Sequence, residues 1–228
     1  MTGKRVSSRS GVGRKILAIA AAAVVLASGA TVTSLAATGW SDEEWVNGGV
    51  AGVPGVTAST FNVQQNVVAA PNTAGWSDHP ATPGNSMSFS SPTTGLVPGE
   101  TVYAFVRLRT VVKSLGGTLQ LTAATMDTGG SAPLFSALRY RAKLMNGDTG
   151  CTSANFAATG SYLVGDATTE QPLATAAGST FTLAAGTTTL PGAEQTVCFA
   201  MTLPHPQSGT ALQGASTTPV WQFTADSI

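Results

Sequence analysis

The sequence predicts an all-β protein: an antiparallel β-sandwich of jelly-roll or immunoglobulin-like type, preceded by an N-terminal signal helix. About nine short runs of alternating apolar and polar residues are separated by clusters of Gly, Pro and Asn. No run has the spacing of a strongly amphipathic helix. Charged residues make up only 10% of the 228 residues, and Thr, Ser, Ala and Gly are abundant, which is typical of β-rich extracellular proteins.

The N-terminus has the pattern of an export signal. Five cations and no acid precede Asp42, and residues 16–27 carry no polar side chain, the length of a signal-peptide apolar core. Ser34, Ala36 and Ala37 supply the small side chains that a signal peptidase accepts. An uncleaved anchor is the alternative, since residues 16–37 could cross a bilayer. We expect residues 1–37 to be a signal peptide, removed by a dedicated signal peptidase during export.

An acidic segment, residues 38–55, follows the signal peptide and precedes a single sandwich domain, residues 56–228. Two tryptophans flank three consecutive acids in it, and residues 56–65 then alternate like a first strand with Phe61 inward. Large apolar side chains at a freed N-terminus favour docking, either on the chain's own sandwich or on a second copy. The candidate assembly residues are Trp40, Asp42, Glu43, Glu44, Trp45 and Phe61.

The next elements follow from alternation and turn residues. Pro-rich residues 71–85 predict a loop and residues 86–90 a short strand. Pro98-Gly99 predicts a turn before the clearest strand, residues 101–111. In that strand Val102, Ala104, Val106 and Leu108 share one face, and Tyr103, Phe105, Arg107 and Arg109 share the other.

The second half of the chain continues the pattern. Gly116-Gly117 leads into a strand over 118–126, and residues 134–145 alternate as a strand but also fit a short helix. Residues 147–158 predict a loop that holds Cys151. Further strands are expected over 161–164, 180–184, 195–203 and 219–225, the last with Trp221 in the core.

The signal region, residues 1–37, is basic, and the rest of the chain is acidic. Without residues 1–37, six cations face eleven acids, a net charge of −5, which argues against nucleic acid as a partner. Five of the six cations fall at i, i+2 spacing on two strands, and would form one basic face if those strands were neighbours. Such a face could bind an anionic wall polymer or the acidic residues 42–44 of another copy, or it could simply be solvated. These residues are Arg107, Arg109, Arg139, Arg141 and Lys143; the sixth cation is Lys113.

The chain has two cysteines, Cys151 and Cys198. In an exported protein an even number of cysteines favours a disulfide, and two buried thiols are the alternative. A catalytic role is not indicated, because there is no Cys-x-x-Cys pair and no histidine close by in the sequence.

Both ends of the sequence resemble a known group of proteins. The signal, Trp40-Ser41-Asp42 and the T-A-x-T-F-x-V run at 57–63 are similar to proteins with a SipW-type signal peptide, which include the TasA and camelysin-like surface proteins of Gram-positive bacteria. Residues 196–203, 211–214 and 220–225 resemble the closing strands of that group. The resemblance implies a secreted β-sandwich and matrix fibres, in which an N-terminal strand completes the sheet of the next subunit.

No catalytic or cofactor site is predicted. His79 and His205 lie in proline loops, there is no HExxH or GxSxG pattern, and Asp78 beside His79 is the least implausible metal pair. The resemblance implies a metalloprotease as a further alternative. Trp76 could stack on a sugar, although loop packing is its commoner use. We therefore expect an exported, non-enzymatic protein of the cell surface or matrix that self-associates; the alternative is a cell-wall or glycan binding module.

Overall fold

The computed structural model describes residues 59–69, 74–90, 95–145, 150–158, 160–205 and 212–228. These all belong to one compact unit, residues 42–228. The predicted signal helix and the cleavage residues 34, 36 and 37 lie outside the described residues, and so do five of the candidate assembly residues: Trp40, Asp42, Glu43, Glu44 and Trp45. Within the described part, no helix is long and apolar enough to cross a membrane.

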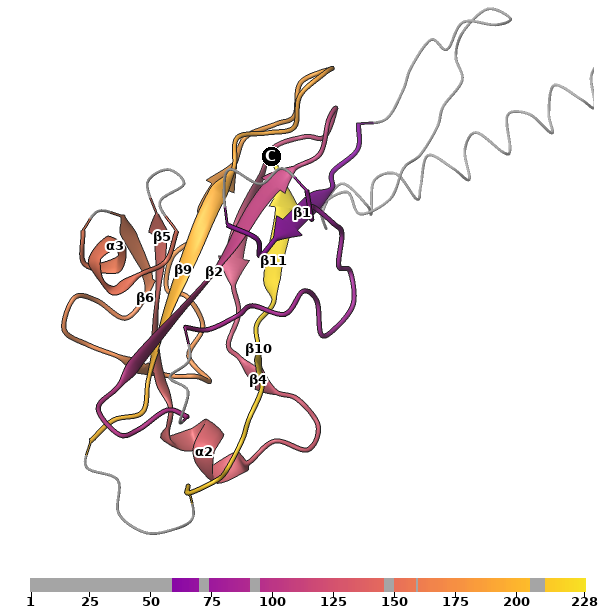
Figure 1. Ribbon diagram of the computed structural model, residues 1–228. Helices are drawn as coiled ribbons and strands as arrows, with labels where there is room; N and C mark the ends of the chain where they lie inside the picture. The colour runs from indigo at the N-terminus through magenta and orange to yellow at the C-terminus, as the bar shows by residue number, and fades with distance from the viewer. Residues whose placement is uncertain (1–58, 70–73, 91–94, 146–149, 159, 206–211) are drawn as a thin grey trace, which may run out of the picture. The chain divides into compact units, whose positions relative to one another are not determined.

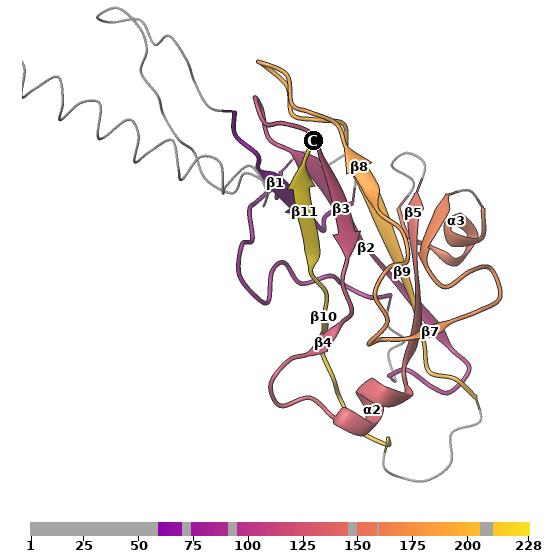
Figure 2. The ribbon, with the colours of Figure 1, turned by 180° about the vertical axis from the view of Figure 1, so that it is seen from behind.

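The fold is an antiparallel β-sandwich, as predicted (Figures 1 and 2). The larger sheet runs in the order β1-β2-β9-β5-β6, with β7 beside β5; its strands are β1 Val63–Asn66, β2 Thr101–Thr110, β9 Gln195–Thr202, β5 Arg139–Met145, β6 Ser161–Val164 and β7 Gln171–Pro172. The smaller sheet runs β11-β3-β8, with β11 Phe223–Ser227, β3 Gly117–Leu121 and β8 Phe181–Leu183. A short ladder pairs β4 Thr125–Met126 with β10 Pro219–Val220.

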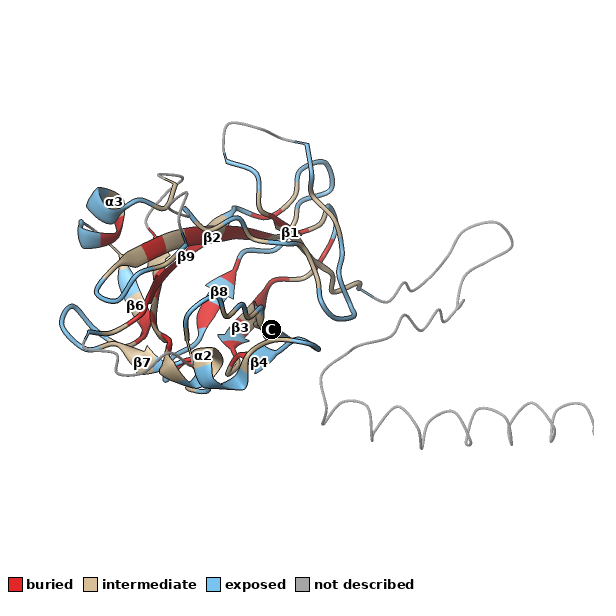
Figure 3. Cartoon of the chain, turned by 60° about the horizontal axis from the view of Figure 1, so that its bottom comes forward, coloured by how far each residue is buried: buried red, intermediate tan, exposed pale blue. Residues whose placement is uncertain are grey.

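The core lies between the two sheets, and Figure 3 shows buried segments of β2, β9, β3 and β8 there. Alternation along each strand decides which side chains enter it. Val106 of β2, Phe199 of β9 and Tyr140 of β5 face Leu119 of β3 and Leu183 of β8 across the sandwich, and all five are buried. The predicted alternation of 101–111 is therefore confirmed, and the face with Val102, Ala104, Val106 and Leu108 is the one that is buried.

Two short helices flank β5 and β6. In α2 Ala132–Ala137, the Ser131 hydroxyl accepts a hydrogen bond from Leu134 N at 3.3 Å, and a proline occupies the first turn, both of which favour helix initiation. In α3 Ser153–Ala157, the Thr152 hydroxyl accepts from Asn155 N at 3.2 Å. Residues 134–145 are therefore a helix end followed by a strand, and the predicted loop 147–158 contains a helix.

Four predicted strands differ from the structure. The first, expected over 56–65, is β1 Val63–Asn66; residues 59–62 hold only an isolated bridge at Thr60, and residues 56–58 lie outside the described part. Residues 86–90 form no strand, because Ser90 is the only one of them that hydrogen-bonds to a sheet backbone in the described structure. The run 118–126 breaks into β3 and β4 where the backbone changes partner: Thr122 N donates to Gln222 O and Ala124 N to Leu173 O. The run 219–225 is likewise divided into β10 and β11, with Trp221 between them.

Tyr140 gives the fold a testable dependence on high pH. Its side chain is fully buried, its hydroxyl donates to Thr175 O, and burial raises its pKa from 10.0 to about 12. The stability that this shift represents is fully present below pH 10 and is lost as the pH rises from 10 to 12, a loss of about 3 kcal/mol in unfolding free energy.

The test is urea unfolding at several pH values between 9 and 12. The chain with Tyr140→Phe has no buried phenol, so its stability should fall less steeply over the same window. Parallel curves for the two chains would contradict the prediction. Tyr162→Phe, at a partly buried tyrosine with no such contact to Thr175, is the control.

Candidate functional site

A cleft opens between the two sheets on the side where β1 and β11 lie. We call it the inter-sheet cleft; its volume is about 610 Å³, and it is lined from the two sheets chiefly by Val106, Leu108, Leu119, Phe199, Trp221 and Phe223. Trp221 forms its floor, with its ring 4.9 Å from Phe199 and 5.6 Å from Tyr140, centroid to centroid. Its volume lies in the range of ligand-binding pockets, and its lining combines apolar side chains with threonines and amides.

The cleft is bordered by an edge strand. β11 pairs with β3 on one side, and among the described residues no strand lies on its other side. Phe223 and Ala225 of β11 line the cleft, whereas Thr224 and Asp226 are exposed. Backbone groups along an unpaired edge form a template for another strand, and the side chains of an added strand would alternate between the cleft and solvent.

The predicted basic face exists as a set of residues on one side of the larger sheet, but β9 separates its two halves. Tyr103 and Arg141 both pair with Ala200, and Phe105 and Lys143 both pair with Cys198. Arg107 and Arg109 therefore lie two strands from Arg139, Arg141 and Lys143. Each of the five cations is engaged within the chain.

Arg107 and Arg109 form a cluster with Glu194 and Trp76. Arg107 is 3% exposed; its Nε donates to Glu194 Oε2 at 3.1 Å and its Nη1 to Val68 O at 3.0 Å. The Arg109 guanidinium lies 4.0 Å from the Trp76 ring centroid, and burial lowers its pKa while Glu194 opposes the shift. Trp76 is thus packed against two cations, which is the loop-packing alternative rather than a sugar platform.

The other three cations cap or cover local structure. Arg139 Nη1 donates to the carbonyls of Ser136, Ala137 and Leu138, at the C-terminal end of α2, where carbonyls lack helical partners. Arg141 lies 3.8 Å from Glu170 Oε1. Lys143 is 3% exposed.

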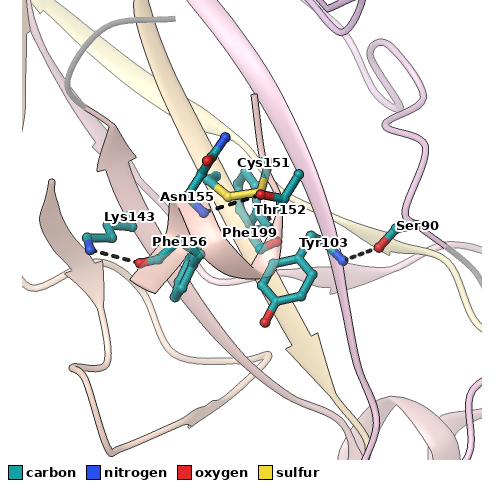
Figure 4. Close-up of a disulfide and its surroundings, with 9 residues drawn as sticks. Ser90, Tyr103, Lys143, Cys151, Thr152, Asn155, Phe156 and Phe199 are labelled. Atoms are coloured by element: carbon teal, nitrogen blue, oxygen red, sulfur yellow. Dashed lines mark hydrogen bonds between the residues drawn. A yellow bond between two sulfur atoms is a disulfide. The ribbon is translucent and has the colours of Figure 1, made fainter. Parts of the chain in front are cut away.

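A disulfide joins Cys151 to Cys198, with Cα atoms 5.5 Å apart, and thus ties α3 to β9 (Figure 4). Phe156 of α3 packs in a second buried cluster with Met145, Cys198 and Ala200. The Lys143 ammonium donates to Phe156 O at 2.9 Å. Disulfide, helix and lysine together cover the middle of the sheet's outer face, where the sequence alone predicted a basic surface.

Phe61 and the candidate metal pair belong to the same end and side of the sandwich as β1. The Phe61 ring lies so close to Gly117 that a Cβ there would overlap with it, so this candidate assembly residue packs on its own domain. Asp78 accepts from Asn62 Nδ2 at 2.8 Å, while His79 Nε2 contacts Ser77 Oγ at 2.9 Å. Among the described residues, no three His, Cys, Asp or Glu side chains are grouped as metal ligands.

Several residues of this region were not singled out by sequence reasoning. Glu194 is far from Arg107 in sequence and carries no motif. Met87 and Phe89, which line the cleft, lie in a run that we predicted as a strand, and their alternation with exposed serines was the available signal.

No protein-family model matches the chain, and no curated protein matches it significantly.

Proposed function

We propose that this chain is an exported structural protein of the cell surface or extracellular matrix, and that its copies associate by strand addition. In this proposal residues 38–58 of one copy lie along β11 of another. The observation that carries it is the edge of β11 with which no strand of the described residues pairs, directly beside the inter-sheet cleft. Main-chain hydrogen bonds would supply affinity, and alternate side chains entering the cleft would supply specificity.

The composition of the N-terminal segment supports this role. It carries two tryptophans and several valines among glycines and acids, so it offers large apolar side chains to the apolar side chains that line the cleft. Residues 59–66 already pair within their own domain: Leu115 N donates to Thr60 O at 2.8 Å, and β1 pairs with β2. The pairing of residues 59–66 supports limiting the proposed exchanged part to residues before 59, a narrower segment than the sequence indicated.

Export is supported by the signal-like N-terminus and by the disulfide, since disulfides persist in oxidising compartments outside the cytoplasm. The alternative function, binding a wall polymer through the basic face, gains no support from the geometry. Its five cations are held by Glu194, Glu170, Trp76 and backbone carbonyls.

Two variants separate the ability to donate the N-terminal segment from the ability to accept it along β11. A chain that begins at residue 54 should accept a segment but donate none. A chain from residue 38 with Ala225→Lys places a charge in the cleft and should donate but not accept, because an inward lysine blocks an edge strand. Each should be monomeric alone, and their mixture should form a 1:1 complex, whereas the unsubstituted chain from residue 38 should form larger species.

The measurement is size-exclusion chromatography with light scattering over a range of concentrations. Thr224→Lys, at an exposed position on the same strand, is the matched control and should assemble like the unsubstituted chain. Circular dichroism establishes that every variant is folded. Polymers of the chain that begins at residue 54, or a strictly monomeric chain from residue 38, would overturn the proposal.

A further inference from the structure

A single connection covers the mouth of the inter-sheet cleft. We call residues 77–89 the strap; Figure 1 shows this connection crossing in front of the strands between β1 and the start of β2. Most of the strap lines the cleft, including His79, Pro80, Pro83, Met87 and Phe89. The strap therefore lines the same cleft as Phe223 and Ala225 of β11, the residues that an added strand would meet.

The strap is held firmly at its two ends. Gln65 and Ser77 exchange both backbone hydrogen bonds, at 3.0 and 3.1 Å. At the other end Ser90 N donates to Tyr103 O at 2.8 Å, and Tyr103 N donates to Ser90 Oγ at 2.9 Å. These anchors would keep the strap attached to the domain even if its middle moved.

The middle of the strap is held differently. Between residues 78 and 89 the described structure has no backbone–backbone hydrogen bond to either sheet. Polar side chains bridge it instead, at its beginning: Asn62 Nδ2 donates to Asp78 Oδ2 at 2.8 Å. A segment without ladder hydrogen bonds opens at a lower free-energy cost than a strand does.

Side chains at the end of the strap alternate between the core and solvent, as those of a β-strand do. Met87 and Phe89 are partly buried against the core, while Ser86, Ser88 and Ser90 are exposed. The Phe89 ring lies 6.4 Å from the Trp221 ring on the cleft floor. Inward side chains at i, i+2 are the pattern that an added strand would present to the same cleft.

We propose that the strap is a built-in competitor: it closes the inter-sheet cleft in the free subunit and is displaced when the N-terminal segment of another copy adds along β11. This inference rests on the proposed function. In the complex, apolar side chains of the added segment take the positions that Met87 and Phe89 hold in the free subunit. Association is delayed until the strap opens. Premature assembly of newly exported chains is thereby slowed.

A single engineered thiol reports the position of the strap. The chain's two cysteines are joined to each other, so Met87→Cys introduces the only free thiol. It is placed in the chain that begins at residue 54, and its reaction with a maleimide is timed alone and after saturation with the Ala225→Lys donor. We expect the thiol to react about tenfold faster in the complex, because displacement removes its protection.

Ser88→Cys is the matched control, since Ser88 is exposed in the free subunit and should react equally in both states. A complex that forms while the thiol at position 87 stays protected would overturn the strap proposal and leave the proposed function standing. Failure to form any complex would instead count against the proposed function.

A second variant tests the strap by kinetics. Met87→Ser in the unsubstituted chain from residue 38 weakens the apolar anchor, so assembly followed by light scattering should begin several-fold sooner. Val97→Ser removes an apolar side chain that is 52% exposed and is not part of the cleft lining, and should leave the lag unchanged. An unchanged or longer lag with Met87→Ser in folded protein contradicts the proposal.

Discussion

Replacing Phe199 with alanine should lower the free energy of unfolding by about 3–5 kcal/mol, the largest effect of any single substitution that we predict. Phe199 is fully buried in the centre of β9, with its ring against Trp221. Its partners across the sheet are Ala104 on β2 and Ala142 on β5. Because neither alanine can extend into the vacated space, the cavity should persist, and its cost adds to the lost burial.

Denaturant unfolding followed by tryptophan fluorescence measures this loss. Phe199→Leu keeps much of the side-chain volume and should cost clearly less. Leu190→Ala is the exposed control: Leu190 is 64% exposed, and its loss should change stability by less than about 0.5 kcal/mol. A Phe199→Ala protein within about 1 kcal/mol of the original chain would show that the two sheets can collapse around the gap.

Removing the disulfide should cost about 4 kcal/mol of unfolding free energy. The bond joins residues 47 apart in sequence, so cutting it gives the unfolded chain much more conformational freedom. In the folded state it holds α3 over the buried Cys198 and Ala200, where Phe156 also packs. Replacing both cysteines with alanine tests this without leaving a reactive thiol.

The measurement is again denaturant unfolding, with hydrogen exchange to follow residues 150–158. We expect loss of protection at α3 first, since Phe156 and the Lys143 bond to its carbonyl would be its remaining anchors. The double alanine chain should keep the strand content of the original by circular dichroism. Equal stability of the two chains would mean that packing alone positions α3.

Much of the sheet could be predicted from alternation, because a strand's period of two is a local property. The faces of β2 and β5, the course of β9 and the disulfide partners all followed from residue type and spacing. Where alternation and helical spacing overlapped, over 134–145, the decision came from Ser131 and the proline in the first turn of α2. The helix α3 was missed because its five residues carry too little periodicity.

The candidate sites depended on contacts that local patterns do not encode. The basic face was predicted on the condition that its two strands were neighbours, but β9 lies between them. Arg107, Arg109 and Arg141 contact Glu194, Glu170 and Trp76, which are remote from them in sequence. The predicted strand 86–90 had the right alternation for Met87 and Phe89. It is not a strand, because only its last residue meets a sheet backbone among the described residues.

By itself, the sequence determined the fold class and which residues of the main strands share a face, because side-chain alternation and residue type act over a few neighbours. It favoured a disulfide between its two cysteines and left two free thiols as the alternative. The tertiary structure alone decided that β9 separates the two halves of the basic face and that α3 covers the outer face of the larger sheet. It also decided that β11 is an edge strand among the described residues, beside a cleft that the strap helps to line. Strand order and coverage depend on which distant segments pack together, and the free energy of that packing belongs to the whole chain.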